Sequence, residues 1–168
     1  HTFMAVGDFE VSPDERLLDY TIGDNGYRQY RLHVKDLASG DTLAVTDERV
    51  TSVAWDADSR VLFYTQEDAT SKRSYRLYSR ELSQPRPTLR EEERDERFDV
   101  QVNLTRSGEY LVYTVSSHTT SEVSVLRADQ PFQAFSLITP RVQDREYYVD
   151  HRRGEFWIRT NDHGRNFR

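Results

Sequence analysis

At 168 residues, the chain is long enough for a single domain with a buried core. Its net charge of −6 at pH 7 disfavours nucleic acid as a partner, because phosphate binding needs a basic surface. The chain contains no Cys, which excludes disulfides and thiolate metal sites, and it has no run of about 18 apolar residues that would predict a membrane span.

The first predicted unit covers residues 9–46 and consists of four short strands, at 9–11, 17–20, 30–37 and 41–46. Pro13 and Asp14 separate the first two strands and favour a tight turn. The third strand alternates apolar with charged residues, which is typical of a strand with one solvated face. Gly40 then favours a hairpin turn before the weaker fourth strand.

The same pattern recurs in three further units, near 53–92, 98–138 and 148–168. Residues at the ends of the four second strands align at spacings of 44, 49 and 46: Tyr20, Tyr64, Tyr113 and Arg159. A shared place on the second strand predicts a shared environment. We therefore expect one aligned residue per unit to be buried between neighbouring units: Leu18, Leu62, Leu111 and Trp157.

Four strands per unit at a period in the mid-forties indicate an all-β fold, a β-propeller built from four-stranded blades. A helical solenoid would need a 3.6-residue period, and an immunoglobulin-like sandwich gives no reason for a repeat. The count is about three and a half blades of a presumed seven-bladed ring. The chain is thus expected to be a fragment of a longer protein. Its terminal blades would lack partners and favour self-association.

Catalytic and metal-binding patterns are missing from the sequence. No G-x-S-x-G nucleophile motif occurs, and no two of the five His residues have metal-ligand spacing. A surface position is expected for His33, a turn position for His151 and loop positions for His118 and His163. We therefore expect no catalytic residues, no metal and no cofactor in this chain.

Several stretches resemble the prolyl oligopeptidase family, and within it the oligopeptidase B branch. The resemblance begins with "VGDFEVSPDERLLDYTIGDNGYRQYRLHVKDLASGDTL" and continues through "VAWDADSRVLFYTQED", "ATSKRSYRLYSREL", "HTTSEVSVLRAD" and "REYYVDHRRGEFWIRTNDHGRNFR". The individual matches are short, but together they cover essentially the whole chain in order.

The resemblance implies a seven-bladed propeller that covers an α/β-hydrolase domain absent from this chain. The implied activity is serine-type hydrolysis of short peptides after Lys or Arg, with the propeller acting as a lid. The implied partners are the hydrolase domain and basic peptides, and the implied location is the cytoplasm, with the periplasm as an alternative. A different function also fits the residues, namely a stand-alone propeller scaffold that binds a protein partner.

One side chain is a candidate for a contact with the hydrolase domain or with substrate. Members of the family often carry paired Arg before Gln-Tyr in the first blade, and here only Arg28 of that pair is kept, before Gln29 and Tyr30. The resemblance implies that Arg28 pairs with carboxylates of the hydrolase domain or with the C-terminal carboxylate of a peptide. The alternative is a solvated Arg at a hairpin end.

Overall fold

The computed structural model describes residues 4–23, 26, 29–162, 164 and 167. All regular secondary structure within these residues is β-strand. Blade 1 contains β1 (Ala5–Val11), β2 (Leu17–Gly23), β3 (Arg31–Asp36) and β4 (Thr42–Glu48). Blade 2 contains β5 (Val50–Trp55), β6 (Val61–Glu67), β7 (Ser74–Glu81) and β8 (Thr88–Glu92). Blade 3 contains β9 (Asp99–Leu104), β10 (Tyr110–Ser116), β11 (Ser121–Arg127) and β12 (Ser136–Thr139). In the described part of blade 4 the strands are β13 (Tyr147–Arg152) and β14 (Glu155–Thr160).

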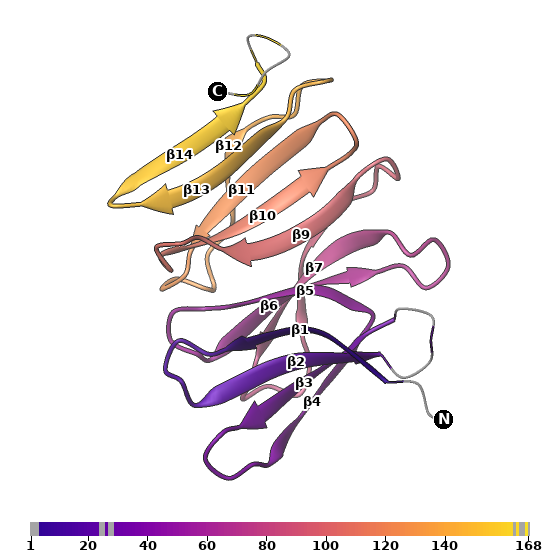
Figure 1. The fold of residues 1–168 in the computed structure, drawn as a ribbon, viewed down its shortest axis with the longest axis vertical. Helices are drawn as coiled ribbons and strands as arrows, with labels where there is room; N and C mark the ends of the chain where they lie inside the picture. Colours follow the sequence, from indigo (N-terminus) through magenta and orange to yellow (C-terminus); the bar gives the residue numbers. More distant parts are fainter. Residues whose placement is uncertain (1–3, 24–25, 27–28, 163, 165–166, 168) are drawn as a thin grey trace.

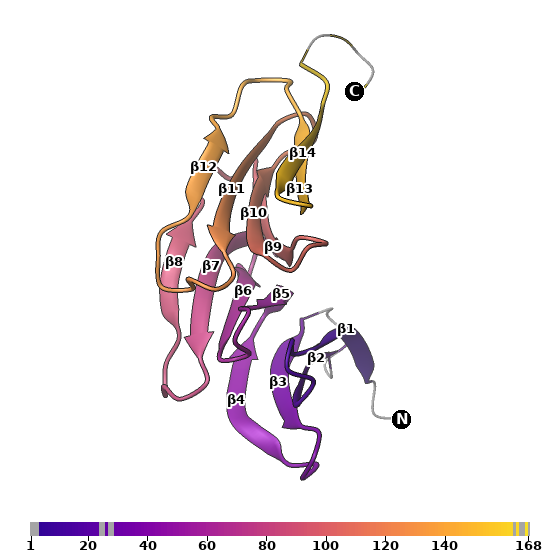
Figure 2. The same ribbon diagram turned by 90° about the vertical axis from the view of Figure 1, so that its left-hand side faces the viewer.

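The blades are antiparallel sheets that stack face to face in chain order (Figure 1). The first strands of consecutive blades contact one another, β1 with β5 and β5 with β9. The fourth strands β4, β8 and β12 lie together on the opposite side of the stack (Figure 2). The expected all-β chain of four-stranded sheets is therefore confirmed, with the first strands on the inner side and the fourth strands on the outer side.

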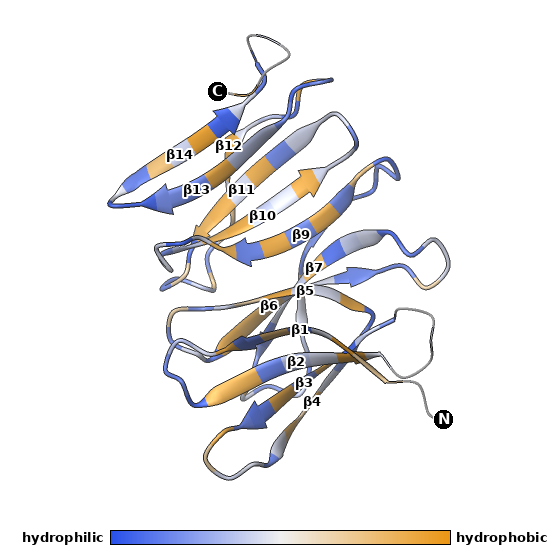
Figure 3. Cartoon of the chain, in the orientation of Figure 1, coloured by the Kyte–Doolittle hydropathy of each residue, from blue (hydrophilic) through white to orange (hydrophobic). Residues whose placement is uncertain are grey.

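Apolar residues concentrate on the middle strands, because these strands are covered on both faces (Figure 3). Strand β6 shows this most clearly. Phe63 packs with residues of blade 3, whereas the next residue, Tyr64, packs with residues of blade 1. Both side chains are almost completely buried. A run of consecutive large apolar residues is thus what a strand between two blades requires.

The recurring turn between first and second strands is closed by a side chain at one fixed position. Ser12 Oγ accepts a hydrogen bond from the Leu17 backbone N–H at 3.0 Å. In blade 2 the same bond runs from Val61 N–H to Asp56 Oδ1, at 2.9 Å, and in blade 3 from Tyr110 N–H to Thr105 Oγ1, at 3.2 Å. A short polar side chain at this position therefore explains why the turn recurs with similar but not identical residues.

The expectation for Trp157 is wrong, and the hairpin length explains why. Leu62 pairs with Trp55 across a six-residue connection, 56–61, and both Leu62 and Leu111 are fully buried. In blade 4 Phe156 pairs with His151 across a shorter connection, so Phe156 takes the place of Leu62. Trp157 then points to the other face and is 63% exposed, because neighbours on a strand face opposite sides.

Among the described residues, no neighbouring sheet covers the outer faces of blades 1 and 4. Leu18 lies on the open face of blade 1 and is only half-buried, so its predicted burial between blades is also wrong. On the same face Phe9, which pairs with Tyr20, is 67% exposed. On blade 4 the open face carries Trp157 and Tyr148. Each face presents apolar side chains of the kind that the inner seams bury.

Leu62→Ala tests the seam between blades 1 and 2. The substitution removes a fully buried side chain, so we expect the free energy of unfolding to fall by ~2–5 kcal/mol. Trp157→Ala is the matched control at a concentration where the chain is monomeric, and its effect there should stay within about 0.5 kcal/mol, because that side chain is exposed. Chemical denaturation of the two variants gives the measurement, and equal losses would contradict the assigned faces.

The open faces also predict self-association of the purified chain. Exposed apolar sheet surface favours pairing with a second copy. We expect light scattering after size exclusion to show a mass above 19.8 kDa that decreases on dilution. Trp157→Lys should shift the equilibrium toward monomer. A constant monomer mass at high micromolar concentration would rule the prediction out.

Candidate functional site

The chain connections divide the stack into two rims. The connections after second and fourth strands gather at the right-hand edge of Figure 1, which we call the long-loop rim; among described residues it includes 68–73, 93–98, 117–120 and 140–146. The hairpins 12–16, 56–60, 105–109 and 153–154 gather at the opposite edge, the hairpin rim. Both rims are rich in polar and charged residues, so candidate contacts with ligands or partners are sought on both rims and along the inner strands.

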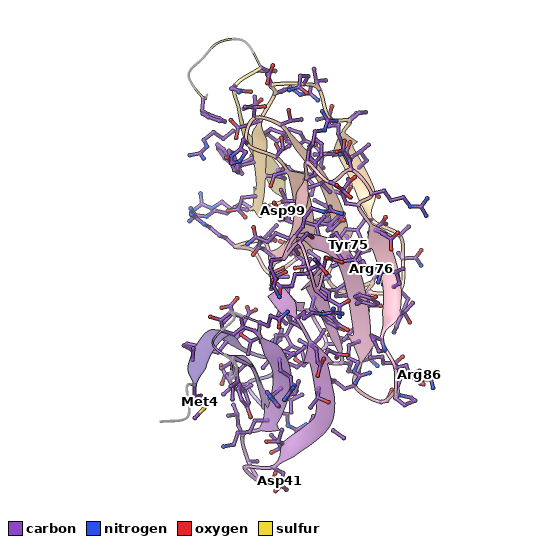
Figure 4. The ribbon with its side chains drawn as sticks, turned by 90° about the vertical axis from the view of Figure 1, so that its right-hand side faces the viewer. Met4, Asp41, Tyr75, Arg76, Arg86 and Asp99 are labelled. Carbon is purple, nitrogen blue, oxygen red and sulfur yellow. The ribbon has the colours of Figure 1, made fainter. Side chains whose placement is uncertain are left out.

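A groove of about 710 Å³ opens on the long-loop rim between blades 2 and 3. Figure 4 looks onto this rim and labels Tyr75 and Asp99, which line the groove. Asp68 also lines it, and its carboxylate accepts the backbone N–H groups of Thr70 and Ser71, both at 2.9 Å. These bonds hold the pKa of Asp68 below its usual value, so this carboxylate stabilises its own loop.

Arg73 fixes the wall of that groove. Its guanidinium donates to the carbonyl oxygens of Phe98 at 2.8 Å and Glu93 at 3.1 Å, in the connection between blades 2 and 3. It also lies over the Tyr75 ring, 5.3 Å from the centroid. Arg73 therefore holds a loop by its backbone.

Arg141 joins two acidic side chains near the same rim. It contacts Glu93 Oε2 at 2.6 Å and Glu122 Oε1 at 3.1 Å, and its guanidinium lies 4.3 Å from the centre of the Phe98 ring. These bonds to Glu122 and Glu93 hold the pKa of Arg141 above its usual value despite partial burial. The connection before blade 4 is thereby tied to blades 2 and 3.

A Ser, a His and a Glu meet at the hairpin rim between blades 3 and 4. Ser107 Oγ lies 2.9 Å from His151 Nδ1, and Glu109 Oε1 lies 3.6 Å from the same nitrogen. A hydrolytic triad needs the Ser and the acid on different ring nitrogens. Here both are at Nδ1, and the ring is buried against Tyr110 and Phe156. The arrangement therefore packs one hairpin onto the next and does not activate a nucleophile.

Two of the His residues differ from expectation. A turn position was expected for His151, but it belongs to β13, pairs with Phe156 and is only 3% exposed. His33 is half-buried and stacks on Tyr20, where a surface position was expected. His118 is exposed in a loop. His163 and the proposed contact residue Arg28 lie outside the described residues, so the role predicted for Arg28 stays a prediction.

The seam between blades 1 and 2 contains one buried and one largely buried carboxyl group that the sequence did not predict. Asp19 accepts a hydrogen bond from Trp55 Nε1–H at 2.6 Å, and its side chain is 1% exposed. Asp47 Oδ2 lies 3.4 Å from Arg80 Nε; the Arg80 side chain is buried and that of Asp47 is largely buried. Alternation along β2 places Asp19 on the face toward blade 2, but no pattern in the sequence predicts which buried donor it meets.

Burial raises the pKa of Asp19 to about 7. The Trp55 hydrogen bond opposes this shift, whereas nearby Glu10 and Asp8 add to it. Burial likewise raises the pKa of Asp47, against the opposing effect of Arg80. Asp19 is thus poised to change charge near neutral pH in a seam between blades.

No group of three His, Cys, Asp or Glu side chains in the described part of the chain has an arrangement that would hold a metal ion. In the same residues there is no helix with the length and apolar character of a membrane span.

Asp19→Asn tests the seam carboxyl. A carboxyl pKa that is higher in the folded state means that the folded state binds more protons between pH 4 and 7, so stability falls as pH rises through this range. Asn keeps an acceptor for Trp55 but cannot ionise. We therefore expect the variant to gain stability relative to the parent by up to about 1.4 kcal/mol per pH unit. Denaturation of both proteins from pH 4 to 8 gives the difference, and a constant difference would contradict the assignment.

Comparisons with known proteins agree on the family to which the chain is similar. Residues 1–168 match the family described as prolyl oligopeptidase, N-terminal beta-propeller domain. Dipeptidyl aminopeptidase BI of Pseudoxanthomonas mexicana is 35% identical over 96% of this chain and 23% of its own length. Protease 2 of Moraxella lacunata is 27% identical over 98% of this chain and 24% of its own length.

Solved structures support the same fold. Oligopeptidase B from Leishmania major superimposes with a TM-score of 0.89 at 20% identity, over 96% of this chain and 23% of that one. The chain thus spans about a quarter of the length of these relatives. The names of these relatives describe different peptidases, and the part of each that matches this chain is about a quarter of its length. The propeller expectation is confirmed, and the chain belongs to the prolyl oligopeptidase family, as its N-terminal β-propeller domain.

Proposed function

We propose that this chain is the lid portion of a serine oligopeptidase that hydrolyses short peptides after Lys or Arg. The observation that carries the proposal is the match of the entire chain to the propeller domain of a peptidase family. The preference for Lys or Arg rests on the resemblance to the oligopeptidase B branch. Relatives about four times as long support a partner domain, which we take to be the α/β-hydrolase.

The geometry supports a role in gating. First strands line the inner side of the stack, and in a closed ring of seven blades they would surround a narrow channel. Such a channel passes an extended peptide and excludes a folded domain. The open faces of blades 1 and 4 are the surfaces that further blades would cover.

The long-loop rim is the surface we assign to the hydrolase domain. It carries charged loops: Arg73 holds one of them by its backbone, and Arg141 ties another to the side chains of Glu93 and Glu122. The side chains at the tips are thereby presented on a fixed frame. Within the described residues neither rim holds a Ser and a His in a geometry suited to nucleophilic attack. The chemistry is therefore assigned to the partner domain.

The test uses blocked reporter peptides and two proteins: the longer protein that contains this chain, and the 168-residue chain alone. We expect the longer protein to release coumarin from a reporter ending in Arg-Arg, and a serine-directed phosphonate to abolish the release. The chain alone should show no turnover, because it lacks the nucleophile.

Two further reporters separate the branches of the family. A blocked reporter ending in Pro tests prolyl cleavage, and an unblocked dipeptide reporter tests dipeptidyl aminopeptidase activity. Faster cleavage of either would contradict the preference for Lys or Arg. Phosphonate-sensitive turnover by the repurified chain alone would contradict the lid assignment.

A further inference from the structure

Three carboxyl groups gather where the inner strand of blade 1 meets blade 2. Glu10 on β1 lies directly opposite Asp19 on β2, so their side chains share the face toward blade 2. Asp8 precedes them on β1, where its backbone N–H donates to Thr21 Oγ1 at 2.9 Å. Asp8 and Glu10 both add to the raised pKa of Asp19, and Asp8 adds to that of Glu10, which places the three within electrostatic reach of one another.

This acidic cluster has no cation to balance it among the described residues. None of the three carboxylates forms an ion pair with a described Lys, Arg or His. Asp19 Oδ1 is used by Trp55, but Asp19 Oδ2 is buried and has no hydrogen-bond partner. A buried carboxylate oxygen without a donor is costly, and neighbouring like charges add to the cost. Such an arrangement is stabilised when a cation binds beside it.

The cluster is accessible from the inner side of the stack. Asp8 and Glu10 are exposed, and Asp19 lies beneath them. Asp8 also lines a pocket of about 220 Å³ between β1 and β5, together with the hydroxyl-bearing residues Thr21, Tyr30, Thr51 and Ser52. Hydroxyl and carboxylate oxygens are the acceptors that an ammonium or guanidinium group requires. In a closed ring this pocket would face the channel.

We propose that Asp8, Glu10 and Asp19 form a binding site for the cationic group of a peptide. Asp8 and Glu10 make the direct contacts, and Asp19 contributes charge from below. This inference rests on the proposed function, since it gives the lid a role in selecting peptides that carry positive charge. The cation is a Lys or Arg side chain or an N-terminal ammonium, and both sources present donors of the same kind.

The test measures binding without turnover, so its result is independent of whether the longer protein is a peptidase. Trp157→Phe leaves Trp55 as the only Trp of the 168-residue chain, and its indole is bonded to Asp19. Fluorescence of Trp55 is titrated with three peptides: acetyl-Gly-Arg-Gly-amide, its citrulline analogue, and the citrulline analogue with a free N-terminus. The first carries only a side-chain cation, the second carries none, and the third carries only an N-terminal ammonium.

We expect binding of at least one charged peptide and none of the neutral one. Glu10→Gln should weaken that binding roughly tenfold, and Asp8→Asn by a similar factor, because each removes one charged acceptor. Asp41→Asn is the matched control, since it removes one charge from an exposed hairpin of the same blade, and it should leave the affinity unchanged. Glu10 and Asp8 are exposed, so both variants should fold.

The three peptide titrations distinguish a side-chain cation from an N-terminal ammonium, and they can also contradict the proposed site. Binding of the Arg peptide alone assigns the site to a basic side chain, and binding of the free-amine peptide alone assigns it to the N-terminus. Equal binding of the neutral peptide, or an unchanged affinity in both Glu10→Gln and Asp8→Asn, would overturn the inference. A peptidase assay that fails while this binding persists would refute the proposed function and leave the cation site standing.

Discussion

The structure depends on one constraint: a four-stranded sheet with two apolar faces must have both faces covered. Blade 2 meets this constraint within the chain, because blades 1 and 3 cover it on either side. Its middle strand β6 is accordingly apolar on both faces, with Phe63 and Tyr64 buried in different seams. Blades 1 and 4 meet it on one face only. The stacking order, the inner and outer sides and the exposed aromatic residues at both ends all follow from this requirement.

Apolar burial brings the blades together, but polar contacts fix how they are positioned. The Trp55–Asp19 hydrogen bond and the Asp47–Arg80 ion pair join blades 1 and 2 at two separate points. Hydrogen bonds between neighbouring hairpins also position the blades. Asp14 N–H donates to Ser59 Oγ between blades 1 and 2, and Arg106 N–H donates to Asp150 Oδ1 between blades 3 and 4. Directional bonds of this kind specify one rotation angle between neighbouring sheets, whereas an interface of apolar contacts alone would allow several.

The sequence predicted the parts of the fold that depend on period and alternation. Strand type, turn position and the burial of Leu62 and Leu111 followed from the repeat. Trp157 did not, because a hairpin with Arg153 and Gly154 at its tip shifts the register by one residue and reverses every face after it. The candidate cation site could not be predicted from the sequence either. Asp8, Glu10 and Asp19 are ordinary acidic residues in the sequence, and only the pairing of β1 with β2 brings them together.

The connections between blades differ in length, and this affects how neighbouring blades are held in position. Arg49 alone links β4 to β5, with a left-handed backbone (φ 59°), and its carbonyl accepts from Glu67 N–H at 2.9 Å. The links to blades 3 and 4 are much longer, 93–98 and 140–146. A one-residue tether restrains blades 1 and 2 covalently, whereas the longer links to blades 3 and 4 depend for their position on the bonds that Arg73 and Arg141 make.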